Sequence, residues 1–166
     1  MKDFENLSKQ DGEKLVNGNS IYLEADKIER NELLVTNDND GFFYDKKIGD
    51  KISRQNFYFS KWTINFNNTS NKIVVEPCIL SLYDNGHYTL TFPYSSGLYG
   101  RTRPYAQLFL NIKFRKWEYT LQATRANWPV GCGNHSHEFS GNISKDNYDQ
   151  VTGITLQVDG SLFNCR

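Results

Sequence analysis

The sequence predicts an all-β protein, an antiparallel β-sandwich of about nine or ten short strands with at most one or two short helices. A closed or flattened β-barrel is the alternative. Three observations support this fold class. Aromatic residues make up 14% of the 166 residues, while alanine, which favours helices, is rare. Short runs of alternating apolar and polar residues are separated by turn residues. Residues 78–92, CILSLYDNGHYTLTF, have the pattern of a β-hairpin.

The register of this hairpin follows from its apolar residues. A two-residue turn would place apolar residues opposite polar ones at every position. A three-residue loop that ends at Gly86, with Gly86 in the left-handed conformation of a bulge, pairs Leu82 with Tyr88. It also pairs Leu80 with Leu90, so the apolar face closes. We therefore predict the three-residue loop.

The remaining chain contains further strand and turn signals. Strands are predicted over residues 21–25, 33–36, 41–44, 57–66, 72–75, 106–114, 117–123, 137–143 and 153–158. A change of phase within 57–66 indicates a bulge near Ser60-Lys61. A turn at Arg115-Lys116 would keep eight apolar side chains of 106–123 on one face, giving a second hairpin.

Two segments allow a helical interpretation. The alternation of Ile21, Leu23 and Ala25 indicates a strand, but the sequence EADKIERNELL over residues 24–34 would also form a helix. We expect a strand there. Residues 144–150, SKDNYDQ, would form one helical turn with Ser144 as its N-cap.

Length and charge indicate one domain over residues 1–166. Residues 1–19 form a polar arm, 20–52 an acidic edge or cover segment, and 53–166 the main β body. The first 52 residues hold 8 Lys/Arg against 12 Asp/Glu, and the rest hold 11 against 7. The net charge is zero, so no nucleic-acid partner is expected.

Targeting and cysteine signals are weak. The first 16 residues lack the apolar stretch of a signal peptide, and no run approaches the length of a membrane span, so we expect a soluble protein of undetermined compartment. The three cysteines are odd in number and not in a tight metal spacing. A single bridge between Cys132 and Cys165 is one alternative, and no disulfide framework is indicated.

Two predicted loops contain the candidate ligand-binding residues. The first, residues 93–105, combines Tyr94 and Tyr99 with two arginines. Arg101 and Arg103 offer paired donors beside flat rings, which suits a polar ligand. The alternative is a solvated connection whose tyrosines cover one end of the core.

The second loop, residues 124–137, carries Trp128 next to Asn127. A tryptophan ring with neighbouring amides offers stacking and hydrogen bonds, as a sugar ring requires. The alternative is that Trp128 closes one end of the core, because tryptophan is usually buried. A joint site requires both loops at the same end of the sheets.

Catalytic and metal-binding signals are less specific. His87, His135 and His137, near Cys132, could hold zinc, although their spacing matches no defined zinc motif. No nucleophile elbow occurs, and no pair of carboxylates can be placed together. Catalytic residues are therefore not assigned, and enzymatic activity is less favoured than binding.

These observations favour a non-catalytic binding module for carbohydrate or another small polar ligand, without a cofactor. The alternative is a protein-interaction or self-assembling component, such as an inhibitor, a toxin subunit or a structural protein, with a protein partner or an oligomeric state. The near-zero net charge supports this alternative. A zinc-dependent enzyme is the third hypothesis.

Overall fold

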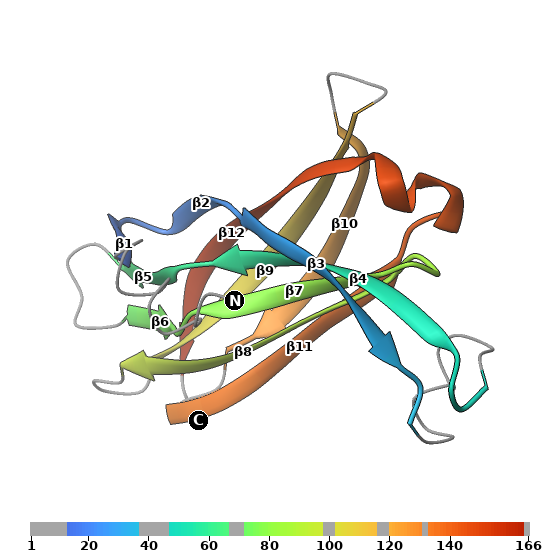
Figure 1. The fold of residues 1–166 in the computed structure, drawn as a ribbon. Helices are drawn as coiled ribbons and strands as arrows, with labels where there is room; N and C mark the ends of the chain where they lie inside the picture. The colour runs from blue at the N-terminus through green and yellow to red at the C-terminus, as the bar shows by residue number, and fades with distance from the viewer. Residues whose placement is uncertain are drawn as a thin grey trace.

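The computed structural model describes residues 13–36, 47–66, 72–97, 102–115, 120–130 and 133–164. Within these ranges the chain forms twelve strands in two sheets and one short 3₁₀-helix (Figure 1). An eight-stranded sheet curls into a half-barrel, and a four-stranded sheet packs against it. The predicted all-β, sandwich-like fold is confirmed. Among the residues described, no helix is long and apolar enough to cross a membrane.

The strands divide between the sheets as follows. The eight-stranded sheet comprises β1 (Glu13–Asn17), β3 (Asp26–Leu34), β4 (Lys51–Phe59), β5 (Lys61–Asn65), β6 (Lys72–Val75), β7 (Cys78–Tyr83), β8 (His87–Gly97) and β11 (Gly133–Asn142). The four-stranded sheet comprises β2 (Ser20–Glu24), β9 (Thr102–Phe114), β10 (Thr120–Pro129) and β12 (Val151–Asn164), in the order β10-β9-β12-β2. Figure 1 shows that the strands of the two sheets run in crossing directions.

Strand β8 is the centre of the eight-stranded sheet. One edge of β8 pairs with β6 and β7, and its other edge pairs with β11 over ten residue positions. The hairpin β7–β8 has the predicted register, with Leu82 opposite Tyr88 and Leu80 opposite Leu90. Gly86 has φ 93° as predicted. Its carbonyl oxygen also accepts a hydrogen bond from the Ile143 amide at 2.8 Å, which ties the turn to the end of β11.

The curl of this sheet coincides with two interruptions in its strands. The predicted strand over 57–66 is divided at Ser60 into β4 and β5, and β6 is separated from β7 by Glu76 and Pro77. The interruption at Ser60 accounts for the change of phase, since Phe59 and Trp62 are both buried. The Glu76 amide donates to the carbonyl oxygen of Pro93 on β8 at 3.1 Å, so the bend remains hydrogen-bonded.

The predicted register of the hairpin β9–β10 is wrong. A two-residue turn at Arg115-Lys116 would pair Leu108 with Ala123, but Leu108 pairs with Ala126. The connection is longer than two residues, and the register shifts between Thr120 and Gln122. On β10 the even-numbered residues therefore face inward, in place of the odd-numbered ones that the two-residue turn would require. The buried Trp128 is one of them.

Other predictions are corrected or extended. Most of the two predicted loops is strand, because β8 continues to Gly97 and β10 continues to Pro129. Residues 26–34 form β3 rather than a helix, and part of the predicted arm forms β1, parallel to β5. The predicted strand at 41–44 lies outside the described residues. The helical turn is confirmed as η2 (Lys145–Gln150), but Ser144 makes no side-chain cap hydrogen bond.

The core lies between the two sheets. It includes, from the four-stranded sheet, Leu108, Leu110, Ile112, Ile154, Leu156 and Val158, and from the eight-stranded sheet, Phe57, Phe59, Leu80, Leu82, Leu90 and Phe92. Ile21 and Leu23 of β2 belong to the same cluster, at 3% and 4% exposed. The segment predicted as a cover thus supplies part of the core itself. Alternation of inward apolar and outward polar residues follows from strand geometry.

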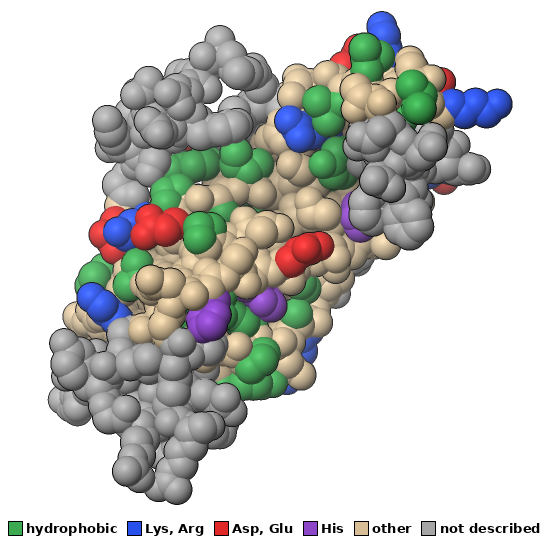
Figure 2. Space-filling model, turned by 90° about the horizontal axis from the view of Figure 1, so that it is seen from below, with side chains coloured by type: hydrophobic (Ala, Val, Ile, Leu, Met, Phe, Trp, Pro, Cys, Tyr) green, Lys and Arg blue, Asp and Glu red, His purple; other side chains and the backbone are tan. Residues whose placement is uncertain are grey.

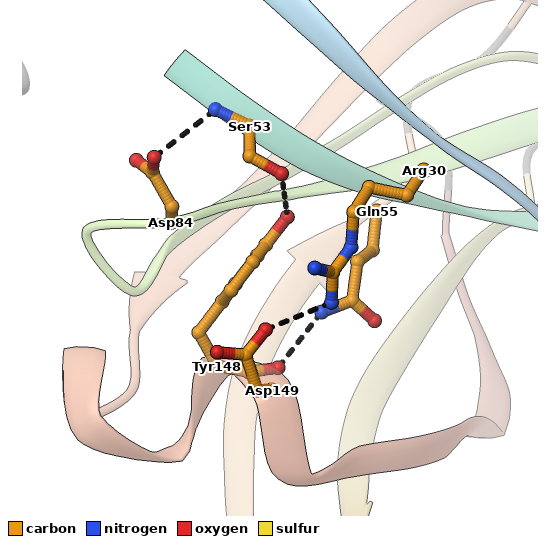
Figure 3. A network of polar contacts seen from close by, with 6 residues as sticks. All are labelled: Arg30, Ser53, Gln55, Asp84, Tyr148 and Asp149. Carbon is orange, nitrogen blue, oxygen red and sulfur yellow. Dashed lines mark hydrogen bonds and ion pairs between the residues drawn. The ribbon is translucent and has the colours of Figure 1, made fainter. Parts of the chain in front are cut away.

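Helix η2 closes one end of the sandwich through Tyr148 (Figure 3). The Tyr148 hydroxyl lies 2.9 Å from the Ser53 hydroxyl. The backbone carbonyl oxygen of Tyr148 accepts a hydrogen bond from the Gln55 side-chain amide at 2.7 Å. Arg30 forms an ion pair with Asp149 at 2.9 Å, and its guanidinium lies 5.2 Å from the centre of the Tyr148 ring. Burial raises the pKa of the Tyr148 hydroxyl, so it remains protonated at neutral pH.

The turn of the central hairpin generates a prediction about two glycines. Gly86 and Gly49 have φ 93° and 92°, a conformation that costs other residues about 1–2 kcal/mol. A methyl group at Gly49 meets no atom within 4 Å, whereas at Gly86 it would overlap the carbonyl oxygen of Ile143. We expect Gly49→Ala to lower the free energy of unfolding by about 1–2 kcal/mol and Gly86→Ala to lower it clearly more. Urea unfolding of both variants measures this difference. Equal losses of unfolding free energy would contradict the close approach of Ile143 to the turn at Gly86.

Candidate functional site

The structure describes only part of the predicted ligand-binding set. Tyr94 lies on β8, and Asn127 and Trp128 lie on β10. Tyr99 and Arg101 lie outside the described residues, as do Cys132 and Cys165 of the suggested bridge. Arg103 is on β9, opposite Phe163 of β12, but its side chain is not described.

The predicted loops begin and end at the same end of the molecule. Ser96 of β8 lies shortly before the undescribed residues 98–101, and Gly133 of β11 follows the undescribed residues 131–132. Ser96 and Gly133 pair with each other. On the other sheet, Tyr105 pairs with Pro129. This placement meets the geometric condition for a joint site, while the connecting residues 98–101 and 131–132 are not described.

Tyr94 and Trp128 meet inside the molecule, in a cluster that we call the aromatic corner: Phe92, Tyr94, Trp128, His135 and His137. The Trp128 ring centre lies 4.7 Å from that of Tyr94 and 5.2 Å from that of Phe92, both edge to face. The His137 ring stacks on Trp128 at 5.2 Å and 24°. Trp128 therefore joins β10 of one sheet to β8 and β11 of the other.

Burial decides what this corner can do. Trp128 is 1% exposed and Tyr94 is 7% exposed, so neither ring offers a free face to a ligand in solution. The geometry corresponds to the alternative interpretation, in which Trp128 closes an end of the core. The sugar-stacking surface predicted on Trp128 is therefore not present at the surface of the described structure.

Two nitrogen atoms in the aromatic corner are buried without a hydrogen-bond partner. They are Nε1 of Trp128 and Nε2 of His137. Leaving such a group unpaired costs about 1–3 kcal/mol. Burial also lowers the pKa of His137, which the nearby Glu138 carboxylate partly opposes. His137 is consequently held neutral among aromatic rings at neutral pH.

The three histidines do not converge on one zinc site. His137 lies opposite Phe92 of β8. His87 is the first residue of β8, and its Nδ1 lies 3.3 Å from Oδ1 of Asn142. Five residues along a strand correspond to about 17 Å. The space-filling view agrees, since its histidine side chains do not gather at one point (Figure 2). In the described ranges no three histidine, cysteine or acidic side chains group as metal ligands.

The described cysteine is also unsuited to chemistry. Cys78 is a free thiol buried in the core. Burial raises its pKa to about 12, and a protonated thiol is neither a nucleophile nor a metal ligand at neutral pH. Cys78 therefore has a packing role.

The outer face of the four-stranded sheet has a different character. We call this surface the amide face, and its members lie in two rows that cross the strands β10, β9, β12 and β2. The first row is Asn127, Gln107, Asp159 and Ser20, and the second is Arg125, Phe109, Gln157 and Tyr22. In each row, directly opposite residues share a face, because strand side chains alternate.

Side-chain hydrogen bonds hold the first row in place. The Gln107 amide donates to Asn127 at 3.3 Å, and the Ser20 hydroxyl donates to Asp159 at 2.7 Å. Gln157, in the second row, donates to Asp159 at 3.2 Å and thereby joins the two rows. These contacts orient amide and carboxylate groups toward solvent on a rigid sheet.

The second row combines rings with a guanidinium group. Arg125 lies over Phe109, with its guanidinium carbon 5.5 Å from the ring centre. At the opposite edge of the sheet Tyr22 is 49% exposed. The amide face therefore offers donors, acceptors and an accessible ring, the combination that the sequence analysis assigned to the two loops.

Most of the amide face was missed by the sequence analysis, which named only Asn127. The alternation of residues 106–114 does indicate that Gln107 and Phe109 point outward. However, the strand order that joins these residues to Asp159 and Tyr22 involves partners far apart in the sequence. Alternation gives the face of each strand but not its neighbours.

Comparison of the chain with protein-family models, with curated proteins and with solved structures found no match. The assignment of function therefore depends on the geometry described above.

The stacked His137 ring generates a pH prediction. Its folded-state pKa lies below the ordinary value of about 6.5, so the unfolded chain takes up the proton first as pH falls. The free energy of unfolding should therefore be unaffected by His137 above about pH 6.5. It should decline as the pH falls from there toward the folded-state pKa of His137. We expect His137→Phe to lose less unfolding free energy than the parent protein between about pH 7.5 and about pH 5.

Urea unfolding at both pH values measures this difference. The control is His87→Gln, because His87 lies far from the aromatic corner, and this variant should keep the parental pH dependence. An unchanged pH dependence in His137→Phe would show that His137 does not contribute to the acid sensitivity.

Proposed function

We propose that the protein is a non-catalytic carbohydrate-binding module whose ligand lies on the amide face. The observation that carries this proposal is the pair of hydrogen-bonded contacts in the first row, Gln107 with Asn127 and Ser20 with Asp159, beside the exposed Tyr22 ring. Sugars present many hydroxyl groups and apolar ring faces. Side-chain amides both donate and accept hydrogen bonds, and aromatic rings cover apolar sugar faces.

Preorganisation supports this interpretation. Binding is weakened when polar side chains must first become ordered. On the amide face, Gln107 and Gln157 are already fixed by contacts with Asn127 and Asp159. Their remaining donors and acceptors are available to hydroxyl groups at little further entropic cost.

Charge also favours a neutral ligand. The two rows contain one arginine and one aspartate, Arg125 and Asp159. Their charges balance, so the face does not attract a polyanion over a distance. The proposal differs from the sequence-based set in keeping Asn127 while transferring the ring contact from Trp128 and Tyr94 to Tyr22.

A protein-interaction role is the second candidate, and it has a separate surface. Leu34 and Ile48 are 58% and 60% exposed. The backbone contacts of Val35 with Gly49 and Asp50 bring these two apolar residues close together. Replacing both with lysine would abolish self-association through this surface, and light scattering over a range of concentrations would detect the change.

Asn127 provides the direct test of the amide face. A hydrogen bond contributes about 1 kcal/mol, so we expect Asn127→Ala to weaken binding to an identified glycan by about fivefold or more. Asn127 is exposed, so the variant should fold normally. A glycan array followed by titration calorimetry measures the effect.

The matched control is Asn134→Ala, an exposed asparagine on β11 at the edge of the other sheet. It should bind like the parent protein. If both variants bind equally well, the ligand does not use the amide face. If the parent protein binds no glycan, the carbohydrate proposal is wrong and the Leu34 and Ile48 surface becomes the leading candidate.

A further inference from the structure

The polar and aromatic groups of the amide face extend across the strands, not along one of them. The second row begins at Arg125 on edge strand β10 and ends at Tyr22 on edge strand β2. Phe109 and Gln157 lie between them on β9 and β12. Neighbouring strands are about 4.8 Å apart, so the row spans about 14 Å.

The two ends of the row offer different interactions. Tyr22 presents an exposed ring at one edge, and Arg125 presents a guanidinium group supported by Phe109 at the other. The parallel row of Asn127, Gln107 and Asp159 provides hydrogen-bonding groups along the same path. A single sugar ring covers only part of this path.

From this arrangement we infer that the ligand is an extended, neutral β-1,4-linked oligosaccharide that crosses all four strands from Tyr22 to Arg125. The inference depends on the proposed carbohydrate-binding function and adds the shape of the ligand. Extended β-1,4-linked chains form flat ribbons whose successive rings can contact a row of side chains. A coiled α-linked chain would contact such a sheet face over only a short part of its length.

The sheet geometry agrees with an extended ligand. Strands in a sheet rotate gradually relative to one another, so the amide face is a shallow, twisted surface and not a closed pocket. Each edge strand contributes a contact, Arg125 on β10 and Tyr22 on β2. A shorter ligand therefore loses the contact at one edge while it keeps those at the centre of the sheet. Affinity should therefore depend on ligand length.

Titration calorimetry with the series from glucose to cellohexaose, and with the corresponding mannose and xylose series, tests the inference. In the series that binds, we expect affinity to increase with each added ring until the chain reaches from Tyr22 to Arg125, and then to remain constant. The gain from the shortest to the longest ligand should be at least tenfold, equal to about 1.4 kcal/mol.

Two variants locate the ends of the ligand. Tyr22→Ala and Arg125→Ala should each remove the gain from the longer oligosaccharides while leaving the weaker binding of the short ones. Tyr83→Ala and Arg115→Ala are the matched controls, because Tyr83 lies on β7 of the other sheet and Arg115 is exposed after β9, outside the two rows. Both controls should keep the full dependence on ligand length.

The outcomes separate this inference from the function on which it rests. Equal affinity for short and long oligosaccharides, or an unchanged length dependence in Tyr22→Ala and Arg125→Ala, would overturn the extended ligand. Binding only to acidic, branched or α-linked glycans on an array would also overturn it. In each of these cases carbohydrate binding itself would stand, whereas the absence of any glycan binding would refute both.

Discussion

The curled sheet depends on the hydrogen-bonded ladders along both edges of β8. One edge holds β6 and β7, and the other holds β11 over its full length. Because strand side chains alternate, the register of β8 decides which residues of its three neighbours face the core. The inward row of β8 then carries Phe92 and Tyr94 against Trp128 of the opposite sheet. Pairing within one sheet and packing between the two sheets therefore meet at the same strand.

Most aromatic side chains that the structure describes lie in the interior. Trp62, Trp128, Phe57, Phe59 and Phe92 are almost completely buried, and they share the core with leucine, isoleucine and valine side chains. The most ring-rich segments of the sequence are for this reason poor guides to a binding surface. The groups that we propose to bind a ligand lie on the outer face of the four-stranded sheet, where shorter and less conspicuous side chains are held by one another.

Local features were predictable from the sequence, and non-local ones were not. The β7–β8 register followed from the apolar pattern and from Gly86, since both strands and their turn lie within twenty residues. The β9–β10 register was missed because a shift between Thr120 and Gln122 leaves no apolar signature. The amide face was missed because β2 reaches β9 only through β12, and periodicity contains no information on such an order.

The position of β12 between β9 and β2 sets the time at which the amide face can exist during synthesis. Strand β2 leaves the ribosome early, but its pairing partner, which contains Leu156 and Val158, comes last in chain order among the described strands. Until then β2 and one edge of β9 remain unpaired, and open edges of this kind favour contact with other chains. A nascent chain consequently lacks the complete amide face, and the proposed ligand binding cannot begin until translation has passed β12.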